Sequence, residues 1–288
     1  MDKSHEFEEL RLDKRAVRRN FDRAAFEYQA HADLQADIAR DLLERCDILN
    51  INPTHVLDLG AGTGNITRGL LKRFARAQGV ALDFSCKMLR CLAQQLSWRQ
   101  RWQKQVTGVC GDAESLPLAS GCFDLVVSNL TLQWCNDSEQ VFREVRRVLK
   151  SGGWFLFTTF GPDTLKELRT AWHSVDAKPH VNLFLDMHDL GDALLRAGFR
   201  DPVMDVERTT RHYPQLLDLL HALKVIGAGN ATGGRSRGLM GKQQLQQLQL
   251  AYEGYRVAAG LPVSYEVIFG CACLGETATR QQWVDAPQ

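Results

Sequence analysis

The sequence lacks the segments that carry a chain into or through a membrane. Residues 1–9 are mostly charged or polar and contain no apolar core, so we expect no secretory signal peptide. No run of about 18 consecutive apolar residues occurs, so we also expect no membrane-spanning helix and no membrane partner. These absences predict a cytoplasmic protein.

The spacing of cysteines that is typical of zinc or redox sites is also missing. Eight cysteines are present, but no two of them form a Cys-x-x-Cys pair. The one close pair, Cys271 and Cys273, lies in an alternating apolar stretch, which predicts a strand with both side chains on one face. We therefore expect no metal site and interpret the cysteines as reduced.

The chain has no overall excess of charge of one sign, since the formal net charge is +1. With 44% hydrophobic and 24% charged residues, the composition is that of an ordinary soluble domain. Locally, residues 68–104 contain nine Lys or Arg and a single acid, Asp83. Such a stretch favours either an acidic partner or a solvated helix face.

Short apolar segments typical of strands alternate with segments typical of helices, which predicts an α/β fold with a doubly wound, mostly parallel sheet. An N-terminal helical segment, residues 1–50, precedes this sheet. The predicted strands are residues 55–59, 79–83, 106–110, 123–128 and 154–160. The predicted helices are residues 65–75, 85–96, 138–149 and 163–173.

The regular alternation of strands and helices ends after residue 161. A helix at 189–197 and a strand at 202–210 are followed by an insertion at about 211–260, and a last strand covers 263–273. The insertion holds a Leu-rich helix, a Gly-rich piece and a Gln-rich helix, and it is far longer than an ordinary connection. We expect it to lie over the site as a lid on a domain spanning 51–275. Residues 276–288 are predicted to be a flexible tail.

The strongest motif is a glycine-rich turn that follows the first strand. Glycines let the main chain turn tightly and let a ligand approach closely. The spacing Gly-x-Gly-x-Gly differs from the dinucleotide fingerprint Gly-x-Gly-x-x-Gly. Asp58, inside the strand, would suit the ammonium group of S-adenosylmethionine (SAM) better than a pyrophosphate. The cofactor candidates here are Asp58, Gly60, Ala61, Gly62 and Gly64.

Three further signals stand at the ends of successive strands. Asp83 can accept hydrogen bonds from both ribose hydroxyls of a nucleotide, and Met88 either covers the adenine or packs in the core. Asp112 and the backbone of Ala113 can pair with the adenine ring. Asn129 ends the fourth strand at the crevice where the strand order reverses. Four such signals in order point to SAM as the ligand.

These residues give the chain a resemblance to class I SAM-dependent methyltransferases over residues 50–160. The glycine turn that this family places before its fifth strand is matched by residues 148–153. The opening Phe-Asp-Arg-Ala-Ala-x-x-Tyr resembles, more narrowly, the malonyl-[acyl-carrier protein] O-methyltransferases. The matching segments are residues 21–35, 128–135, 178–184, 223–228 and 260–266.

The narrower resemblance implies esterification of the free carboxylate of a malonyl thioester on acyl carrier protein, an early step of pimelate and biotin synthesis. A carboxylate is already ionised near pH 7, so the enzyme needs placement and exclusion of water and no base. We therefore expect positioning residues, for which Tyr28, Asn129 and Trp134 are candidates. The candidates for the substrate pocket are Tyr28, Trp134, His180, Asn182 and Tyr265.

Alternatives remain open from the sequence. The same opening resembles a family that modifies protein arginine, and a quinone precursor is another conceivable acceptor, since a fold does not fix its reaction. A SAM-binding assembly factor without turnover is a different class of function. We expect no nucleic-acid partner, because Asn129 is followed by Leu130 and Thr131 and not by the signature of base-modifying enzymes.

Acyl carrier protein is acidic, so basic surface near the pocket is expected to matter. Residues 11–23 hold six bases against Asp13 and Asp22, and residues 143–150 hold four bases against Glu144. The sequence does not decide which cluster faces the carrier.

Overall fold

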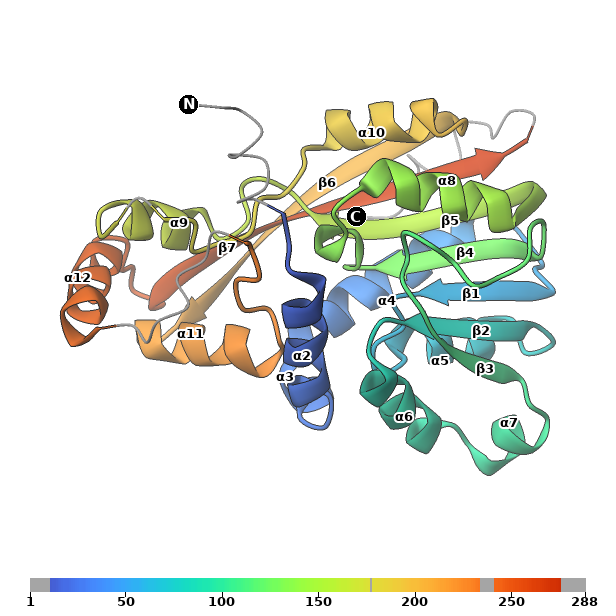
Figure 1. Cartoon of the computed structure of the whole chain (residues 1–288), viewed down its shortest axis with the longest axis horizontal. Coiled ribbons are helices and arrows are strands. Elements are labelled where there is room, and N and C mark those ends of the chain that lie inside the picture. The colour runs from blue at the N-terminus through green and yellow to red at the C-terminus, as the bar shows by residue number, and fades with distance from the viewer. Residues whose placement is uncertain (1–10, 177, 234–240, 276–288) are drawn as a thin grey trace.

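The structure is a computed structural model that describes residues 11–176, 178–233 and 241–275. Its centre is a seven-stranded sheet in the order β3-β2-β1-β4-β5-β7-β6. The first five strands run parallel, and β7 runs antiparallel between β5 and the edge strand β6 (Figure 1). The strands are β1 (His55–Leu59), β2 (Gln78–Asp83), β3 (Val106–Cys110), β4 (Phe123–Asn129), β5 (Leu149–Phe160), β6 (Arg200–Tyr213) and β7 (Leu261–Leu274).

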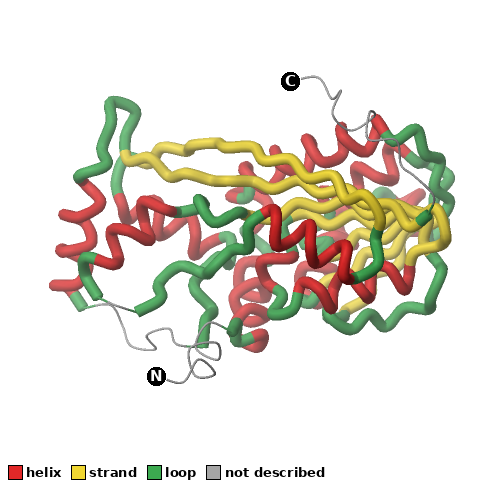
Figure 2. The backbone as a smooth tube through the Cα atoms, turned by 90° about the horizontal axis from the view of Figure 1, so that it is seen from above, coloured by secondary structure: helices red, strands yellow, loops and turns green. Residues whose placement is uncertain are grey.

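Helices cover both faces of this sheet, as Figure 2 shows. They are α2 (Lys14–Ala24), α3 (Tyr28–His31), α4 (Asp33–Ile48), α5 (Asn65–Arg73), α6 (Cys86–Gln95), α7 (Trp98–Trp102), α8 (Ser138–Val148), α9 (Lys166–His173), α10 (Met187–Arg196), α11 (Leu216–Val225) and α12 (Lys242–Glu253), with a short 3₁₀ turn at Leu132–Trp134. The predicted doubly wound α/β fold is confirmed, because every strand and helix proposed between residues 55 and 173 is present with ends shifted by a few residues.

The two-residue period of β1 assigns its side chains to different layers. Leu57 and Leu59 point into the core under α8 and α10, together with Phe155 and Phe157 of β5. Val56 points to the opposite core, which is formed with α4 and α5. Asp58 shares the parity of Val56, so its carboxylate is directed towards α5 and away from the α8 layer. The strand pattern thereby places one acid in the sheet interior.

The fifth strand differs from its prediction. β5 begins at Leu149, not at Trp154, and includes the glycine turn predicted before the strand. Leu149 pairs with Phe123, and a register shift between Phe123 and Leu125 takes up the extra residues. Gly152 adopts a φ of 75°, a backbone conformation that favours glycine. The glycine turn is therefore an irregular start of the strand.

β6 and β7 extend beyond the parallel strands and carry the inserted helices (Figure 2). α9, α11 and α12 form a separate apolar core on this extension, around Trp172, Leu219 and Tyr252. Between α11 and α12 the chain meets the N-terminal segment, where the Asp13 amide donates to the Ala231 carbonyl at 2.8 Å. The predicted tail, residues 276–288, lies outside the described residues, as do 1–10 of the N-terminal segment and 234–240 of the insertion.

Candidate active site

The turn between β1 and α5 is closed by glycines that cannot be replaced. Gly60 and Gly64 have φ values of 80° and 92°. A Cβ atom on Gly60 would lie 1.9 Å from Oγ1 of Thr131, and one on Gly64 would lie 2.0 Å from Cδ1 of Leu92. The Gly60 and Ala61 amides both donate to the Leu82 carbonyl, at 2.8 and 2.9 Å. The turn is thus fixed to the end of β2, beside Asp83.

Asp58 is a buried carboxylate with unused hydrogen-bonding capacity. Its Oδ2 accepts from the Thr67 hydroxyl at 2.5 Å, whereas its Oδ1 is buried and has no hydrogen-bond partner among the described residues. Burial, with a smaller contribution from the nearby Asp83 charge, raises the pKa of Asp58 to about 7. A buried acceptor left unpaired is costly, so this oxygen is suited to a donor that a ligand supplies.

Asp83 ends β2 with both oxygens held by main-chain donors. Oδ2 accepts from the Gly62 amide at 2.8 Å and Oδ1 from the Ser85 amide at 2.7 Å. Burial raises the pKa of Asp83 to about 6, against the lowering effect of these two N–H groups. Each carboxylate oxygen retains a second lone pair. The side chain is therefore oriented and can still accept hydrogen bonds from a ligand.

A cavity of about 920 Å³ of empty space, partly open to solvent, lies against this turn. Most of the predicted cofactor residues line it, as does the predicted acceptor residue Tyr28. Those present are Tyr28, Gly60, Gly62, Asp83, Met88, Asp112, Ala113, Asn129 and Trp134. The other three predicted cofactor residues, Asp58, Ala61 and Gly64, do not line it. Ala61 and Gly64 shape the turn from behind, and Asp58 lies beneath it in β1.

Met88 and Asn129 are more constrained than the sequence suggested. Met88 lines the cavity with only 1% of its surface exposed, so both interpretations given to it, core packing and cavity wall, describe the same position. The Asn129 amide donates to the Gln35 carbonyl at 3.1 Å, and its oxygen accepts from the Thr158 hydroxyl at 2.7 Å. Asn129 therefore links α4 to β5 at the cavity wall.

Lys14 was not identified from the sequence, although it lines the same cavity. Its ammonium group donates to both oxygens of Asp112, at 2.8 and 2.6 Å, and lies 2.6 Å from Glu114. Burial alone would lower the pKa of Lys14, but these two carboxylates raise it, so the lysine is charged. Lys14 was counted only as part of a basic stretch, because nothing local in the sequence links it to Asp112.

A second cavity, of about 910 Å³, adjoins the first. The two share Gln35, Gln133, Trp134, Phe160, Ile226 and Ala228 as lining residues. The remaining wall is mostly apolar and comes from α9, α11 and the loop before α10. Four of the predicted acceptor residues line it, namely Trp134, His180, Asn182 and Tyr265.

Each of these acceptor candidates also has a structural contact. The His180 ring stacks on Trp172 with centroids 3.6 Å apart and pairs with Asp176 at 2.7 Å. The Asn182 oxygen accepts weakly from the Ala231 amide at 3.4 Å. In the first cavity, Tyr28 and Trp134 both pack against Phe21 of α2, and burial holds the pKa of Tyr28 well above its usual value. Tyr28 is therefore a neutral phenol.

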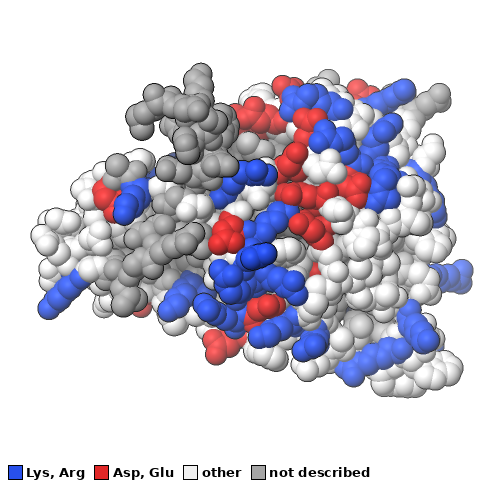
Figure 3. Space-filling view, in the orientation of Figure 1, with Lys and Arg blue, Asp and Glu red and all other residues white. Residues whose placement is uncertain are grey.

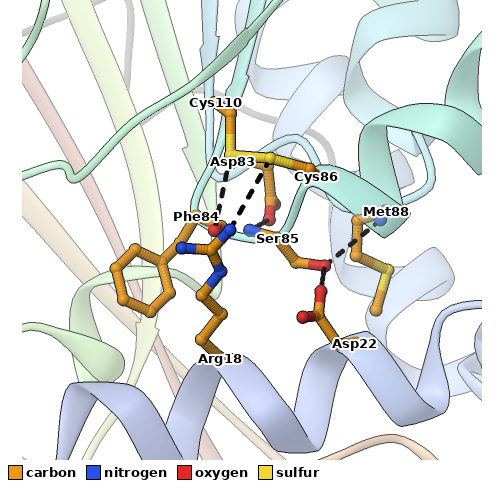
Figure 4. The surroundings of a disulfide bond; sticks show 8 residues. All are labelled: Arg18, Asp22, Asp83, Phe84, Ser85, Cys86, Met88 and Cys110. Carbon is orange, nitrogen blue, oxygen red and sulfur yellow. Dashed lines mark hydrogen bonds between the residues drawn. A yellow bond between two sulfur atoms is a disulfide. The ribbon is translucent and has the colours of Figure 1, made fainter.

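The expectation that all eight cysteines are reduced is wrong for one pair. Cys86, the first residue of α6, and Cys110, the last of β3, form a disulfide with Cα atoms 5.5 Å apart (Figure 4). Because Cys110 pairs with Asp83 across the two strands, the bond lies next to the carboxylate of the cavity. This pair could not be predicted from the sequence, because the cysteines are 24 residues apart and meet only through the β2–β3 register.

The disulfide predicts a measurable thiol count. Alkylation of the denatured protein without reductant should modify six of the eight cysteines, and all eight after reduction, as counted by intact mass. In Cys86→Ser, the freed Cys110 should make all seven remaining cysteines reactive without reductant. Eight alkylated cysteines in the unreduced parent protein would show that the bond is absent.

The residues of the first cavity fit SAM. Asp83 offers acceptors at the end of β2 for ribose hydroxyls, and Asp58, which does not line the cavity, leaves an unpaired carboxylate oxygen buried beneath the glycine turn. The positive-φ glycines leave the main chain of the turn open to a ligand. Among the described residues, no cluster of three potential metal-binding side chains occurs, and no helix is long and apolar enough to cross a membrane.

Comparison with known proteins adds independent evidence. Residues 57–157 match the family model described as a methyltransferase domain. The chain is 46% identical over 269 residues to the malonyl-[acyl-carrier protein] O-methyltransferase of Gallionella capsiferriformans, covering 92% of each chain. It is 47% identical over 263 residues to the enzyme of the same name from a Methylovorus strain, covering 91% of this chain and 89% of that one.

Solved structures share the fold at low identity. The BH2331 protein of Bacillus halodurans superposes with a TM-score of 0.59 at 18% identity, covering 82% of this chain and 99% of the other. The YcgJ protein of Bacillus subtilis gives a TM-score of 0.57 at 16% identity, over 81% and 99%. The relatives that align along the chain, the matched methyltransferase domain and the cavity whose residues fit SAM all indicate the same kind of enzyme. The chain belongs to the malonyl-[acyl-carrier protein] O-methyltransferases, within the SAM-dependent class I methyltransferases.

Proposed function

We propose that this enzyme transfers a methyl group from SAM to the free carboxylate of a malonyl thioester on acyl carrier protein. The product is the methyl ester that primes pimelate and biotin synthesis. The observation that carries this proposal is the second cavity, which adjoins the first along Gln35, Gln133 and Trp134, residues that line both. It gives the acceptor a chamber of its own, and the relatives with this name align along about nine-tenths of the chain.

The lining of the second cavity suits an acceptor whose nucleophile has to be kept from water. Its walls are mostly apolar and include Leu168, Trp172 and Leu223. Leu168 and Trp172 come from α9, which follows β5, and Leu223 comes from α11 of the insertion, so these two helices form one side of the chamber. An apolar wall removes water from a carboxylate nucleophile and makes it more reactive.

The proposed reaction needs no proton transfer. When bound, SAM supplies an electrophilic methyl group on its sulfonium sulfur. An ionised malonyl carboxylate attacks directly, the new C–O bond forms as the C–S bond breaks, and the electron pair stays on sulfur. The chain has to align the carboxylate, and the Gln35 and Gln133 amides and the Tyr28 hydroxyl stand at the shared wall or in the first cavity for that purpose.

We accordingly propose Tyr28, Asn129 and Trp134 as positioning residues. Asn129 acts through its bonds to the Gln35 carbonyl and Thr158, which fix the wall between the cavities. We further propose Asp58 and the turn of Gly60, Ala61, Gly62 and Gly64, with Asp83, Met88, Asp112 and Ala113, as the residues that hold or shape the SAM site. His180, Asn182 and Tyr265 are proposed to shape the acceptor chamber.

The direct test is incubation with SAM and malonyl-acyl carrier protein, followed by mass analysis of the carrier. We expect a gain of one methyl group on the malonyl form. Acetyl-acyl carrier protein is the matched control, because it has the same carrier and thioester but no free carboxylate, and it should gain nothing. Methylation of both carriers, or of neither while another acceptor in a cell extract is methylated, would contradict the proposal.

A further inference from the structure

Helix α2 has two faces of different character. Its inner face closes the first cavity through Lys14, Val17 and Phe21. Its outer face is exposed and carries four arginines at helical spacing, Arg15, Arg18, Arg19 and Arg23. Of these, Arg18 reaches back to the body of the enzyme, over the Phe84 ring and to the Cys86 sulfur at 3.8 Å (Figure 4). One helix therefore forms both a wall of the active site and a basic patch on the surface. Figure 3 shows Lys and Arg side chains gathered over α2 in the centre of the molecule.

The helix is firmly attached to the body of the enzyme. Lys14 is paired with Asp112 and Glu114, and Asp22 accepts from the Ser85 hydroxyl at 2.5 Å. Just before the helix, the Leu12 amide donates to the Asn136 oxygen at 2.8 Å. Asp22, Asp112 and Glu114 thus face inwards, whereas Glu27, just after α2, is exposed, so the outer face is predominantly but not wholly positive.

Those arginines have little local neutralisation. Among the described residues, no ion pair involves Arg15, Arg18 or Arg23, and Arg19 reaches only Asp13 at 4.0 Å. The basic cluster of α8 is different, since Arg143 pairs with Glu139 at 2.6 Å and Arg147 with Glu144 at 2.8 Å. Lys150 likewise pairs with Asp124 at 2.7 Å. Of the two clusters considered from the sequence for the carrier, only that of α2 presents largely unpaired charge.

An apolar side chain extends the patch. Phe26, two residues after the end of α2, is 74% exposed. An exposed aromatic residue beside a set of arginines has the composition of a protein interface, in which the aromatic group supplies the buried contact and the charges steer association. On the far side of the site, Lys224 lines the second cavity and is itself exposed.

We infer that the outer face of α2, Arg15, Arg18, Arg19, Arg23 and Phe26, is the docking surface for the acidic acyl carrier protein. This inference rests on the proposed function. The acidic surface of the carrier binds the arginines, and Phe26 contacts an apolar part of the carrier. The thioester arm enters the second cavity, which adjoins the first cavity that α2 borders. A carrier docked on α8 would meet Arg143, Arg147 and Lys150 already paired, with Arg146 as the one base of that cluster that is in no ion pair among the described residues.

The test is the double variant Arg15→Glu/Arg23→Glu, assayed with two substrates. KM for malonyl-acyl carrier protein should rise about tenfold or more, because opposed charges become like charges at the interface. KM for malonyl-pantetheine, which carries the thioester but no protein or phosphate, should not change, and neither should KM for SAM. The unchanged activity with malonyl-pantetheine also shows that the variant is folded. Phe26→Ser should raise KM for the carrier substrate alone.

The matched control is Arg76→Glu/Arg99→Glu, which has the same change of charge on exposed residues that line neither cavity. It should leave all three KM values unchanged. An unaltered KM for the carrier substrate in Arg15→Glu/Arg23→Glu, or an equal rise in the control, would overturn the docking surface while leaving the proposed function intact. No methylation of malonyl-carrier by the parent protein would instead refute the proposed function and the inference that rests on it.

Discussion

Asp83→Ala is expected to weaken SAM binding by about 100-fold. Two hydrogen bonds from ribose hydroxyls to a carboxylate are worth together roughly 3 kcal/mol, and each 1.4 kcal/mol is a factor of ten. The loss also removes the acceptor that holds the Gly62 amide, so the glycine turn loses one of its fixed points. Isothermal titration calorimetry of SAM against parent and variant measures the effect.

Asp124→Asn is the matched control for this variant. Asp124 is also a carboxylate in the sheet, but it binds Lys150 and the Thr54 and His55 amides and does not line either cavity. These contacts lower its pKa although partial burial alone would raise it, so its loss should reduce the free energy of unfolding and leave the Kd for SAM unchanged. Equal Kd values for Asp83→Ala and the parent would remove Asp83 from the cofactor site.

Binding of SAM should weaken as the pH falls below about 7, by up to tenfold per pH unit. In the free protein burial raises the pKa of Asp58 to about 7, so the carboxyl is largely protonated at pH 6. A cationic ligand favours the ionised form, so binding must release this proton, and the affinity reaches its plateau above the raised pKa. Asp83, with a pKa of about 6, should steepen the dependence at lower pH.

The raised pKa of Asp58 also determines how the stability of the free protein changes with pH. The folded pKa of Asp58 lies above the unfolded value, so the folded free protein binds the proton more tightly than the unfolded chain does. The contribution of Asp58 to stability is therefore full below about pH 4 and is lost as the pH rises to about 7. Saturating SAM should reverse this trend near neutrality, because the ligand stabilises the ionised carboxylate.

Asp58→Asn tests the assignment. Calorimetry in buffers of different ionisation enthalpy reports the number of protons released on binding. The parent protein should release a substantial fraction of a proton at pH 6.5, and the variant should release much less, with a weaker but flatter affinity between pH 6 and 8. Thr67→Val is a useful comparison, since it removes the donor to Oδ2 and should raise the midpoint of the pH dependence. An identical pH profile in parent and Asp58→Asn would show that another group controls binding.

The parallel core and its glycine turn could be predicted because their signals are local. Alternating apolar residues in β1 and the glycines after it record backbone conformation within a few residues, and Asp83 follows from the end of the next strand. At Gly60 and Gly64 an added Cβ atom would collide with Thr131 and Leu92, so close packing around the turn requires glycine at these two positions. The candidates for the acceptor pocket, by contrast, came from the resemblance to a family.

The contacts that decide the details of the site are not local. Lys14 meets Asp112 across 98 residues, Asn129 meets the Gln35 carbonyl across 94, and Cys86 reaches Cys110 only because β2 and β3 are neighbours. The stack of His180 on Trp172 likewise depends on how α9 and the following loop pack. Contacts between such distant residues produce no periodic pattern in the sequence, so they could not be predicted from it.

By itself, then, the sequence determined the sheet, the glycine turn and the carboxylates at the strand ends, and through its resemblance to relatives the kind of acceptor. Only the tertiary structure decided that α2 closes the cofactor cavity with Lys14 inside and its arginines outside. It also decided that Arg143 and Arg147 of α8 are neutralised by nearby acids. The physical reason is that backbone conformation depends on near neighbours in the chain, whereas the pairing of charges depends on which distant segments the packing of helices against the sheet brings together.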